Sequence, residues 1–327
     1  MINSIYFLNG VTKTDLTQDE IKEVLQRNQG VLWVDLVQTP YTEAEQVLLE
    51  LFGFHPLAVS DALDEMHVPR VDDWGDYLYL VLHDIKFDPA QEEVFQTNEL
   101  DIFLGKHFLV TYQNNAIPVV EKVRRLIERD ARFLQRGADH LFYKLADDLV
   151  GETLPVVDQM DDAIDTIEDQ LFNGSNQQLL EQIFTLKRSL LHLRRILMPQ
   201  REVFNKLARG DDHVIDKQER VFFRDIYDHM VRLYDISESL RDLISGALET
   251  YLSVINNRMN DVMKTLTIIT TLFMPISFLT GFFGMNFFAA DPPFTGWTSQ
   301  PVLVVLLCIF VLMPVSMFVW MRSRKWM

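Results

Sequence analysis

Hydrophobic and polar positions alternate differently in successive parts of the chain, and each pattern predicts a different kind of structure. Up to about residue 118, short β-rich runs predict strands at 4–7, 31–36, 77–87, 99–105 and 108–112. Helical segments at 42–51 and 56–63 interleave with these runs, which is typical of a mixed α/β domain. After Pro118 the pattern is almost wholly helical, with breaks at Gly137, 173–176 and 209–212.

A single long helix is predicted from about residue 217 to 283. It holds no proline before Pro275, and its apolar residues recur at helical spacing. At 1.5 Å per residue, about 65 residues span about 100 Å, which is more than a compact domain needs. We expect a coiled-coil-like stalk that continues into the membrane and whose apolar seam is buried by partners. The alternative is two helices broken near Gly246.

Two long uncharged stretches lie near the end of the chain, at 265–290 and 292–321, and Asp291 separates them. Each exceeds the roughly 20 residues that a membrane-spanning helix needs. We therefore predict spans at about 264–285 and 302–321. The predicted domains are a cytoplasmic domain, 1–260, and a transmembrane domain, 261–327. Within the cytoplasmic domain we distinguish an α/β part, a helical part and the stalk: 1–117, 118–216 and 217–260.

Basic residues flank the two predicted spans on one side of the membrane only. They are Arg258, Lys264, Arg322, Arg324 and Lys325, and the loop between the spans contains no Lys or Arg. The positive-inside rule therefore predicts that both termini are cytoplasmic. The segment 1–10 has neither a basic leader nor a long apolar core, so we expect no secretory signal.

One face of the first predicted span is unusually polar and small. Steps of three or four residues from Met263 give a row of hydroxyl, thioether and glycine positions among Leu, Ile and Phe. The row is Met263, Thr267, Thr270, Met274, Ser277, Gly281 and Gly284. Small residues on a membrane helix commonly serve close helix packing. A row that runs the full span and ends at Asn286 instead favours the lining of a pore.

The chain is acidic, with a formal net charge of −17 and a pI near 4.8. Nucleic acid is therefore an unfavourable partner, whereas cations would be concentrated near the surface; the alternative is that the acidity serves solubility alone. The single cysteine, Cys308, lies in the second span, which excludes disulfides within the chain and gives no support to a thiol metal site.

An acidic stripe precedes a basic segment in the helical part. The stripe comprises Asp158, Asp161, Asp162, Asp165, Glu168 and Asp169, and the basic residues are Lys187, Arg188, Arg194, Arg195 and Arg201. An antiparallel hairpin of the two segments would offset the acidic charge. The stripe is interpreted either as a solvated face or as a reservoir or sensor for divalent cations, which prefer carboxylate oxygens.

The sequence has no signature of catalysis. It contains no Gly-rich phosphate loop with Lys and Ser or Thr, no His-Glu-x-x-His helix and no Gly-x-Ser-x-Gly elbow. Its eight histidines are scattered and never share ligand spacing with a cysteine. We therefore expect no enzymatic activity.

The C-terminal motifs resemble the CorA family of magnesium and cobalt channels, a member of the wider superfamily that shares the Gly-Met-Asn triplet. The resemblance rests on Gly284-Met285-Asn286, on the preceding segment 274–284 and on the basic tail 322–327. Segments 67–71, 223–229 and 241–246 also resemble family segments, so the likeness covers essentially the whole chain. It implies an α/β cytoplasmic domain, a long helical stalk and two transmembrane helices, assembled as a funnel-shaped homopentamer in the lipid of the inner membrane.

The resemblance also implies which residues handle the ion. In the family, the Asn of the triplet forms a ring that contacts a hydrated ion, and Met and Leu positions narrow the cytoplasmic half of the pore. Together with Thr270 of the polar row, the implied pore residues are Asn260, Met263, Leu266, Met274, Ser277, Gly284, Met285 and Asn286. Regulatory Mg²⁺ would bind between subunits at Asp88 and Asp225, with Asp84 as the nearby alternative to Asp88.

The resemblance predicts uptake of Mg²⁺, and of Co²⁺, with gating by intracellular Mg²⁺. Met285 favours these ions over the zinc-transporting branch of the family, which usually changes the Met of the triplet. The loop after the triplet carries Asp291 where many members have a glutamate, so Asp291 is the only carboxylate that can attract cations there. The alternatives are zinc transport or a membrane-anchored metal sensor without transport; the polar row argues against the sensor.

Overall fold

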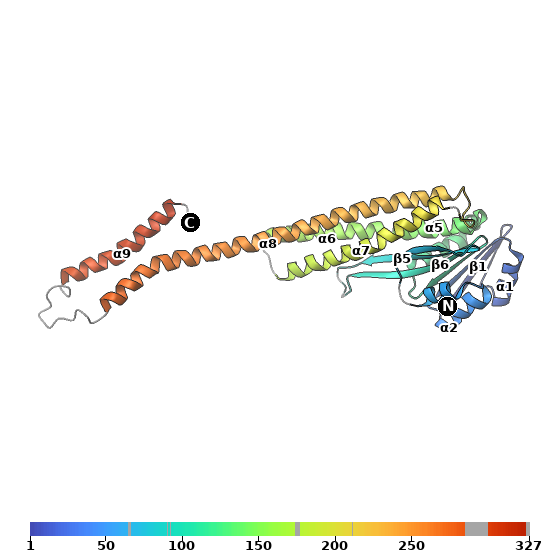
Figure 1. Cartoon of the computed structure of the whole chain (residues 1–327), viewed down its shortest axis with the longest axis horizontal. Helices are drawn as coiled ribbons and strands as arrows, with labels where there is room; N and C mark the ends of the chain where they lie inside the picture. The colour runs from blue at the N-terminus through green and yellow to red at the C-terminus, as the bar shows by residue number, and fades with distance from the viewer. Residues whose placement is uncertain are drawn as a thin grey trace. The chain divides into compact units, whose positions relative to one another are not determined.

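The computed structural model describes residues 1–64, 67–89, 91, 93–173, 177–210, 212–284 and 300–324. The chain divides into two compact units, Met1–Thr250 and Tyr251–Met327 (Figure 1). The boundary falls within the long helix α8, Arg220–Gly284. The expected α/β domain, long helix and two apolar C-terminal helices are therefore all present.

A seven-stranded sheet forms the centre of the first unit, in the order β2-β1-β3-β7-β6-β5-β4. Neighbouring strands are antiparallel except for β3 and β7, which are parallel. The strands are β1 (Ile2–Leu8), β2 (Val11–Thr14), β3 (Val31–Val37), β4 (Arg70–Asp73), β5 (Tyr77–Phe87), β6 (Phe95–Gly105) and β7 (Phe108–Gln113). The five predicted strands are confirmed, whereas β2 and β4 were not predicted because they are short and polar.

The central strands are buried on both faces. In β5, Tyr77, Tyr79 and Val81 belong to one apolar cluster, while the alternate residues Leu80 and Leu82 are equally buried on the other face. A strand that is covered on both faces has a continuous run of apolar residues. The sequence pattern predicted β5 for this reason. Helices therefore cover both faces of the sheet.

Three helices and a π-helical turn near the N-terminus contribute the cluster on one face. They are α1 (Gln18–Arg27), α2 (Tyr41–Gln46), the turn Val47–Leu51 and α3 (Pro56–Leu63). Helix α1 begins with a capping box, in which the Thr17 hydroxyl accepts from the Glu20 N–H and the Glu20 carboxylate accepts from the Thr17 N–H. The sequence pattern did not predict α1, although this Thr-x-x-Glu signal marks its start.

The helices that follow the sheet pack against it and against one another. They are α4 (Pro118–Arg129), a 3₁₀ segment (Ala131–Arg136), α5 (Ala138–Gly151), α6 (Thr153–Asn173) and α7 (Gln177–Arg209). Helices α5, α6 and α7 contact strand β5, and α6 and α7 form the predicted hairpin (Figure 1). The helical part of the chain therefore forms the second layer of the domain.

The predicted hairpin forms, but four residues of the acidic stripe have no ion pair with α7 in the described part of the chain. Residues Asp158, Asp161, Asp162 and Asp165 of α6 are exposed and, within the described ranges, form no ion pair with α7. One basic residue of α7 pairs with α8 instead, because Arg194 reaches Glu238 at 3.0 Å. The two helices face each other with apolar side chains, which leaves the charges on their outer surfaces.

Helix α8 continues through Gly246 without a break, so the alternative of two helices is wrong. The expectation that partners bury its seam is only partly right, because Ile226, Met230, Leu240 and Ile244 are already buried in the single chain. From Leu252 onward the apolar side chains are mostly exposed. Helices of the same domain thus cover the first half of the seam.

The second unit contains the end of α8 and the helix α9 (Gln300–Ser323). Both helices are long and apolar enough to cross a membrane, judged by length and composition. Pro275 and Pro314 lie inside them. Prolines are tolerated in membrane helices because neighbouring helices satisfy the freed carbonyl groups.

Candidate ion pathway

The polar row predicted for the first span lies on one face of α8. At about 100° per residue, the positions from Asn260 to Gly284 fall within an arc of roughly 120°. Every member is exposed in the single chain, including Met263 at 57%, Leu266 at 57% and Met274 at 65%. The structure therefore brings the row together on one exposed face with two further positions that the resemblance implied. The row is Met263, Thr267, Thr270, Met274, Ser277, Gly281 and Gly284, and the further positions are Asn260 and Leu266.

The side chains that are only half exposed lie on a different side of the same helix. They are Ile268, Thr271, Leu272, Pro275, Ile276 and Leu279. At helical spacing these side chains centre far from the row, which therefore lies on an exposed side of the span. Most of these half-exposed side chains are apolar, as is usual for packing between membrane helices. The row holds the thioethers of Met263 and Met274 and the hydroxyls of Thr267, Thr270 and Ser277, whereas Thr265, Thr271 and Thr280 lie elsewhere on the helix.

Backbone carbonyls satisfy the hydroxyl donors of the row. Thr267 donates to the Met263 carbonyl at 2.8 Å, and Thr270 donates to the Leu266 carbonyl at 2.9 Å. Each hydroxyl oxygen keeps lone pairs that can accept a hydrogen bond from water. The row thus presents acceptors and soft thioethers, without a formal charge. Such a surface suits contact with a hydrated cation.

Three of the predicted residues lie outside the described residues: Met285, Asn286 and Asp291. Gly284 is the last described residue of α8 and the first residue of the triplet, so the row on α8 ends where the triplet begins. The proposed roles of these three residues therefore rest on the sequence.

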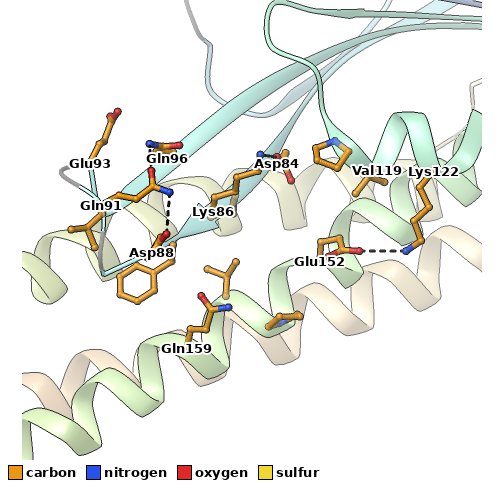
Figure 2. Close-up of a pocket in the computed structure, with 16 residues that line it drawn as sticks. Asp84, Lys86, Asp88, Gln91, Glu93, Gln96, Val119, Lys122, Glu152 and Gln159 are labelled. Atoms are coloured by element: carbon orange, nitrogen blue, oxygen red, sulfur yellow. Dashed lines mark hydrogen bonds and ion pairs between the residues drawn. The ribbon is translucent and has the colours of Figure 1, made fainter.

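Asp88 lies at the end of β5 and is exposed. Its backbone N–H donates to the Val94 carbonyl at 2.9 Å, and the Gln91 side chain donates to its carboxylate at 3.0 Å. Figure 2 shows it at the rim of a pocket of about 390 Å³, which Gln159 of α6 also lines. An exposed carboxylate with neighbouring amide oxygens is a donor set that fits Mg²⁺.

The alternative ligand, Asp84, is in a different environment. It is 4% exposed and accepts a hydrogen bond from Asn98 at 3.3 Å. Burial raises the pKa of the Asp84 carboxyl, while Asn98 and Lys86 lower it. Asp84 and Asp88 line the same pocket, but only the Asp88 side chain is exposed.

Asp225 is exposed near the start of α8. Its charge helps to raise the pKa values of Tyr143 and Asp147 on α5, for which burial is the main cause. Asp88 adjoins α6 instead, so the chain places the two carboxylates beside different helices. No group of three or more His, Cys, Asp or Glu side chains within the described ranges is arranged to hold a metal ion.

A buried ionic contact anchors the start of α8, and the sequence analysis did not identify it. The carboxylate of Glu219 accepts from Arg136 Nη2 at 2.6 Å and from His140 Nδ1 at 2.8 Å. Both Glu219 and His140 are 6% exposed. Glu219 is 79 residues from His140 and 83 from Arg136, so no local spacing indicates the contact. It fixes the helix that carries the row to the α/β domain.

Two apolar helices long enough to cross a membrane, with the polar row along the first, are an arrangement typical of membrane channels and transporters. A family model described as "CorA-like Mg2+ transporter protein" matches residues 28–324. The chain therefore belongs to the CorA family, as the motifs predicted.

Individual relatives agree with this assignment along nearly the whole chain. The YfjQ protein of Bacillus subtilis is 34% identical, over 94% of this chain and 93% of its own. The cobalt/magnesium transport protein CorA of Thermotoga maritima is 33% identical, over 90% of this chain and 83% of its own. The solved CorA magnesium transporter of Methanocaldococcus jannaschii has a TM-score of 0.82 at 22% identity and covers 97% of both chains. The last comparison supports the fold.

Proposed function

We propose that this protein is a homopentameric channel that takes up Mg²⁺, and also Co²⁺, across the inner membrane, with both termini in the cytoplasm. The observation that carries the proposal is the exposed polar row on a span that contains no charged side chain after Lys264. Five copies of the row, one from each subunit, would enclose a path lined by Asn260, Thr270, Ser277 and Asn286. Relatives named as cobalt/magnesium transport proteins support the choice of ion.

Neutral side chains suit the passage of magnesium. Mg²⁺ gives up its inner water shell reluctantly, and amide and hydroxyl oxygens can accept hydrogen bonds from those bound waters. A ring of carboxylates would hold a divalent cation too strongly, whereas conduction requires weak binding. The row therefore favours transport of the hydrated ion over storage.

The membrane potential is a sufficient driving force. Two positive charges that move inward through 100 mV gain about 4.6 kcal/mol, at about 2.3 kcal/mol per charge. The sequence has no nucleotide-binding loop, and the proposed mechanism requires none. Uptake would follow the electrochemical gradient and stop when the pore closes.

Flux into proteoliposomes tests the proposal directly. The full chain is reconstituted, and entry of Mg²⁺, Co²⁺ and Zn²⁺ is followed in parallel with entrapped indicators. We expect Mg²⁺ and Co²⁺ entry that depends on the protein and on an inside-negative potential. Entry of Zn²⁺ alone would favour zinc transport, and no entry of any ion into vesicles with correctly inserted oligomer would favour the sensor.

For gating, we propose that intracellular Mg²⁺ bridges Asp88 of one subunit and Asp225 of the next and so holds the pore closed. When the ion dissociates, the subunits are free to move. The variant Asp225→Lys places an ammonium at the site, so we expect Mg²⁺ on the cytoplasmic side no longer to inhibit uptake. Asp88→Asn should weaken the inhibition and Asp84→Asn should not. Unchanged inhibition in Asp225→Lys would contradict the assignment.

A further inference from the structure

Helix α7 carries an exposed stripe of apolar and basic side chains, here named the α7 stripe. Its members are Phe184, Arg188, Leu191, Arg195 and Met198. They are spaced alternately by four and three residues, which places them on one face over four helical turns. Phe184 is 43% exposed, Leu191 40% and Met198 50%. Apolar side chains at this spacing are typical of a face that packs against another helix.

Among the described residues, the two arginines of the α7 stripe have no carboxylate partner. Arg194 and Arg201, on other faces of α7, pair with Glu238 and Glu202 at 3.0 and 3.1 Å. Arg188 and Arg195 form no ion pair within the part of the chain that the structure describes. The stripe therefore offers two guanidinium groups beside three exposed apolar side chains.

Helix α6 carries the complementary charge. The segment from Thr153 to Asn173 contains six acidic residues and no Lys or Arg. Asp158, Asp162 and Asp165 repeat the spacing by four and three residues, and Asp161 lies beside them on the same exposed face. These four carboxylates, here named the α6 face, have no ion pair among the described residues.

We propose that the α6 face of one subunit docks on the α7 stripe of a second copy of this chain. Within the described part of one chain, neither surface has an ion pair, although α6 and α7 are neighbours in the same hairpin. Their charges are opposite, and their spacings both match helix-to-helix packing. A contact between two different faces, repeated around a rotation axis, closes into a ring. The inference rests on the proposed homo-oligomer and is independent of the transported ion.

Several charges acting together give this contact its specificity. Single exposed ion pairs contribute little, whereas a network of them beside buried apolar side chains contributes more. Contact between two α6 faces would bring like charges together and is disfavoured. The proposed contact thus selects the order of subunits around the ring and keeps the acidic helices apart.

Cysteine cross-linking of the full chain tests the contact. In a Cys308→Ser background, which leaves no native cysteine, Asp162→Cys and Arg188→Cys are combined and treated with a bismaleimide in proteoliposomes. We expect a ladder of covalent oligomers on a denaturing gel. Each single variant should give no ladder, because the two positions lie on different faces. The control pair is Arg188→Cys with Glu43→Cys, which is exposed on α2 and should give none.

The result that would overturn the proposal is an absent ladder when both cysteines react with a monofunctional maleimide. A monomeric protein, or an equal ladder in the control pair, would overturn it as well. Ion flux is measured on the same vesicles. Ion flux without a ladder refutes the contact and leaves the transport function intact. A ladder without ion flux supports the contact and refutes the transport function.

Charge exchange provides a second, independent test. Arg188→Glu with Arg195→Glu should lower the fraction of assembled oligomer seen by light scattering in detergent. Adding Asp162→Arg and Asp165→Arg to the same chain should restore it, because the charges are again opposite. Loss of assembly that the exchange does not restore would contradict the contact.

Discussion

Replacement of Glu219 by alanine tests whether the anchor at the start of α8 holds this helix to the domain. The change removes the acceptor of two hydrogen bonds, from Arg136 at 2.6 Å and from His140 at 2.8 Å. Arg136 is half-exposed and can return to water, so we discount its contribution. His140 stays buried without an acceptor. A lost charged hydrogen bond and an unsatisfied buried donor together give a loss of about 3 kcal/mol.

The assay is thermal unfolding of the full chain in detergent, followed by circular dichroism. For a unit of this size, about 1 kcal/mol shifts Tm by about 2–4 °C, so we expect a decrease of roughly 6–12 °C. The Tm of Glu219→Gln should lie between those of the unchanged protein and Glu219→Ala, because the glutamine amide keeps one acceptor oxygen. The control is Glu249→Ala, an exposed position on the same helix, with an expected change within about 0.5 kcal/mol. A decrease below about 2 °C for Glu219→Ala would refute the reasoning.

Two further predictions concern the buried pair in which Tyr79 donates to Asp101 at 2.6 Å. Tyr79→Phe leaves the buried Asp101 carboxyl group without this donor and should lower the free energy of unfolding by about 1–3 kcal/mol. Tyr41→Phe, at an exposed position, should leave it unchanged. Equal unfolding midpoints for the two variants would contradict this. Burial is the main cause that raises the pKa of Asp101 well above its usual range, and the charge of Glu99 raises it further. The folded state therefore keeps a proton that the unfolded chain releases, and stability should fall as pH rises from the ordinary Asp pKa through the raised one. Asp101→Asn keeps an acceptor for Tyr79 and should flatten this fall, measured as Tm against pH; an unchanged slope would refute the assignment.

Periodicity located the elements whose burial is simple. Strand β5 and helix α3 were predicted at their observed bounds, because one is a continuous apolar run and the other begins at Pro56. The row on α8 followed from the 3.6-residue repeat alone. In contrast, β2 is fully exposed and polar, so it has no apolar signal and exists through its pairing with β1.

Contacts between distant segments could not be read from spacing. The sequence suggested that the bases of α7 would neutralise the acids of α6, yet Arg194 pairs with Glu238. The partner of Arg194 depends on which faces of the helices are packed together by their apolar residues. That arrangement is set by the packing of the whole domain. For the same reason His140 and Glu219 were not identified as partners. Apolar burial decides the arrangement, and the polar pairs follow from it.

The central claim is that the row on α8 lines the ion path, and a matched pair of variants tests it most directly. Thr270 belongs to the row, whereas Thr265 lies on another side of the same helix, and each hydroxyl donates to the carbonyl four residues before it. Thr270→Leu and Thr265→Leu therefore remove the same group and the same hydrogen bond. We predict that Thr270→Leu reduces Mg²⁺ flux into proteoliposomes at least about tenfold, which corresponds to about 1.4 kcal/mol, while Thr265→Leu stays within a factor of two. Equal flux in the two variants would contradict the claim.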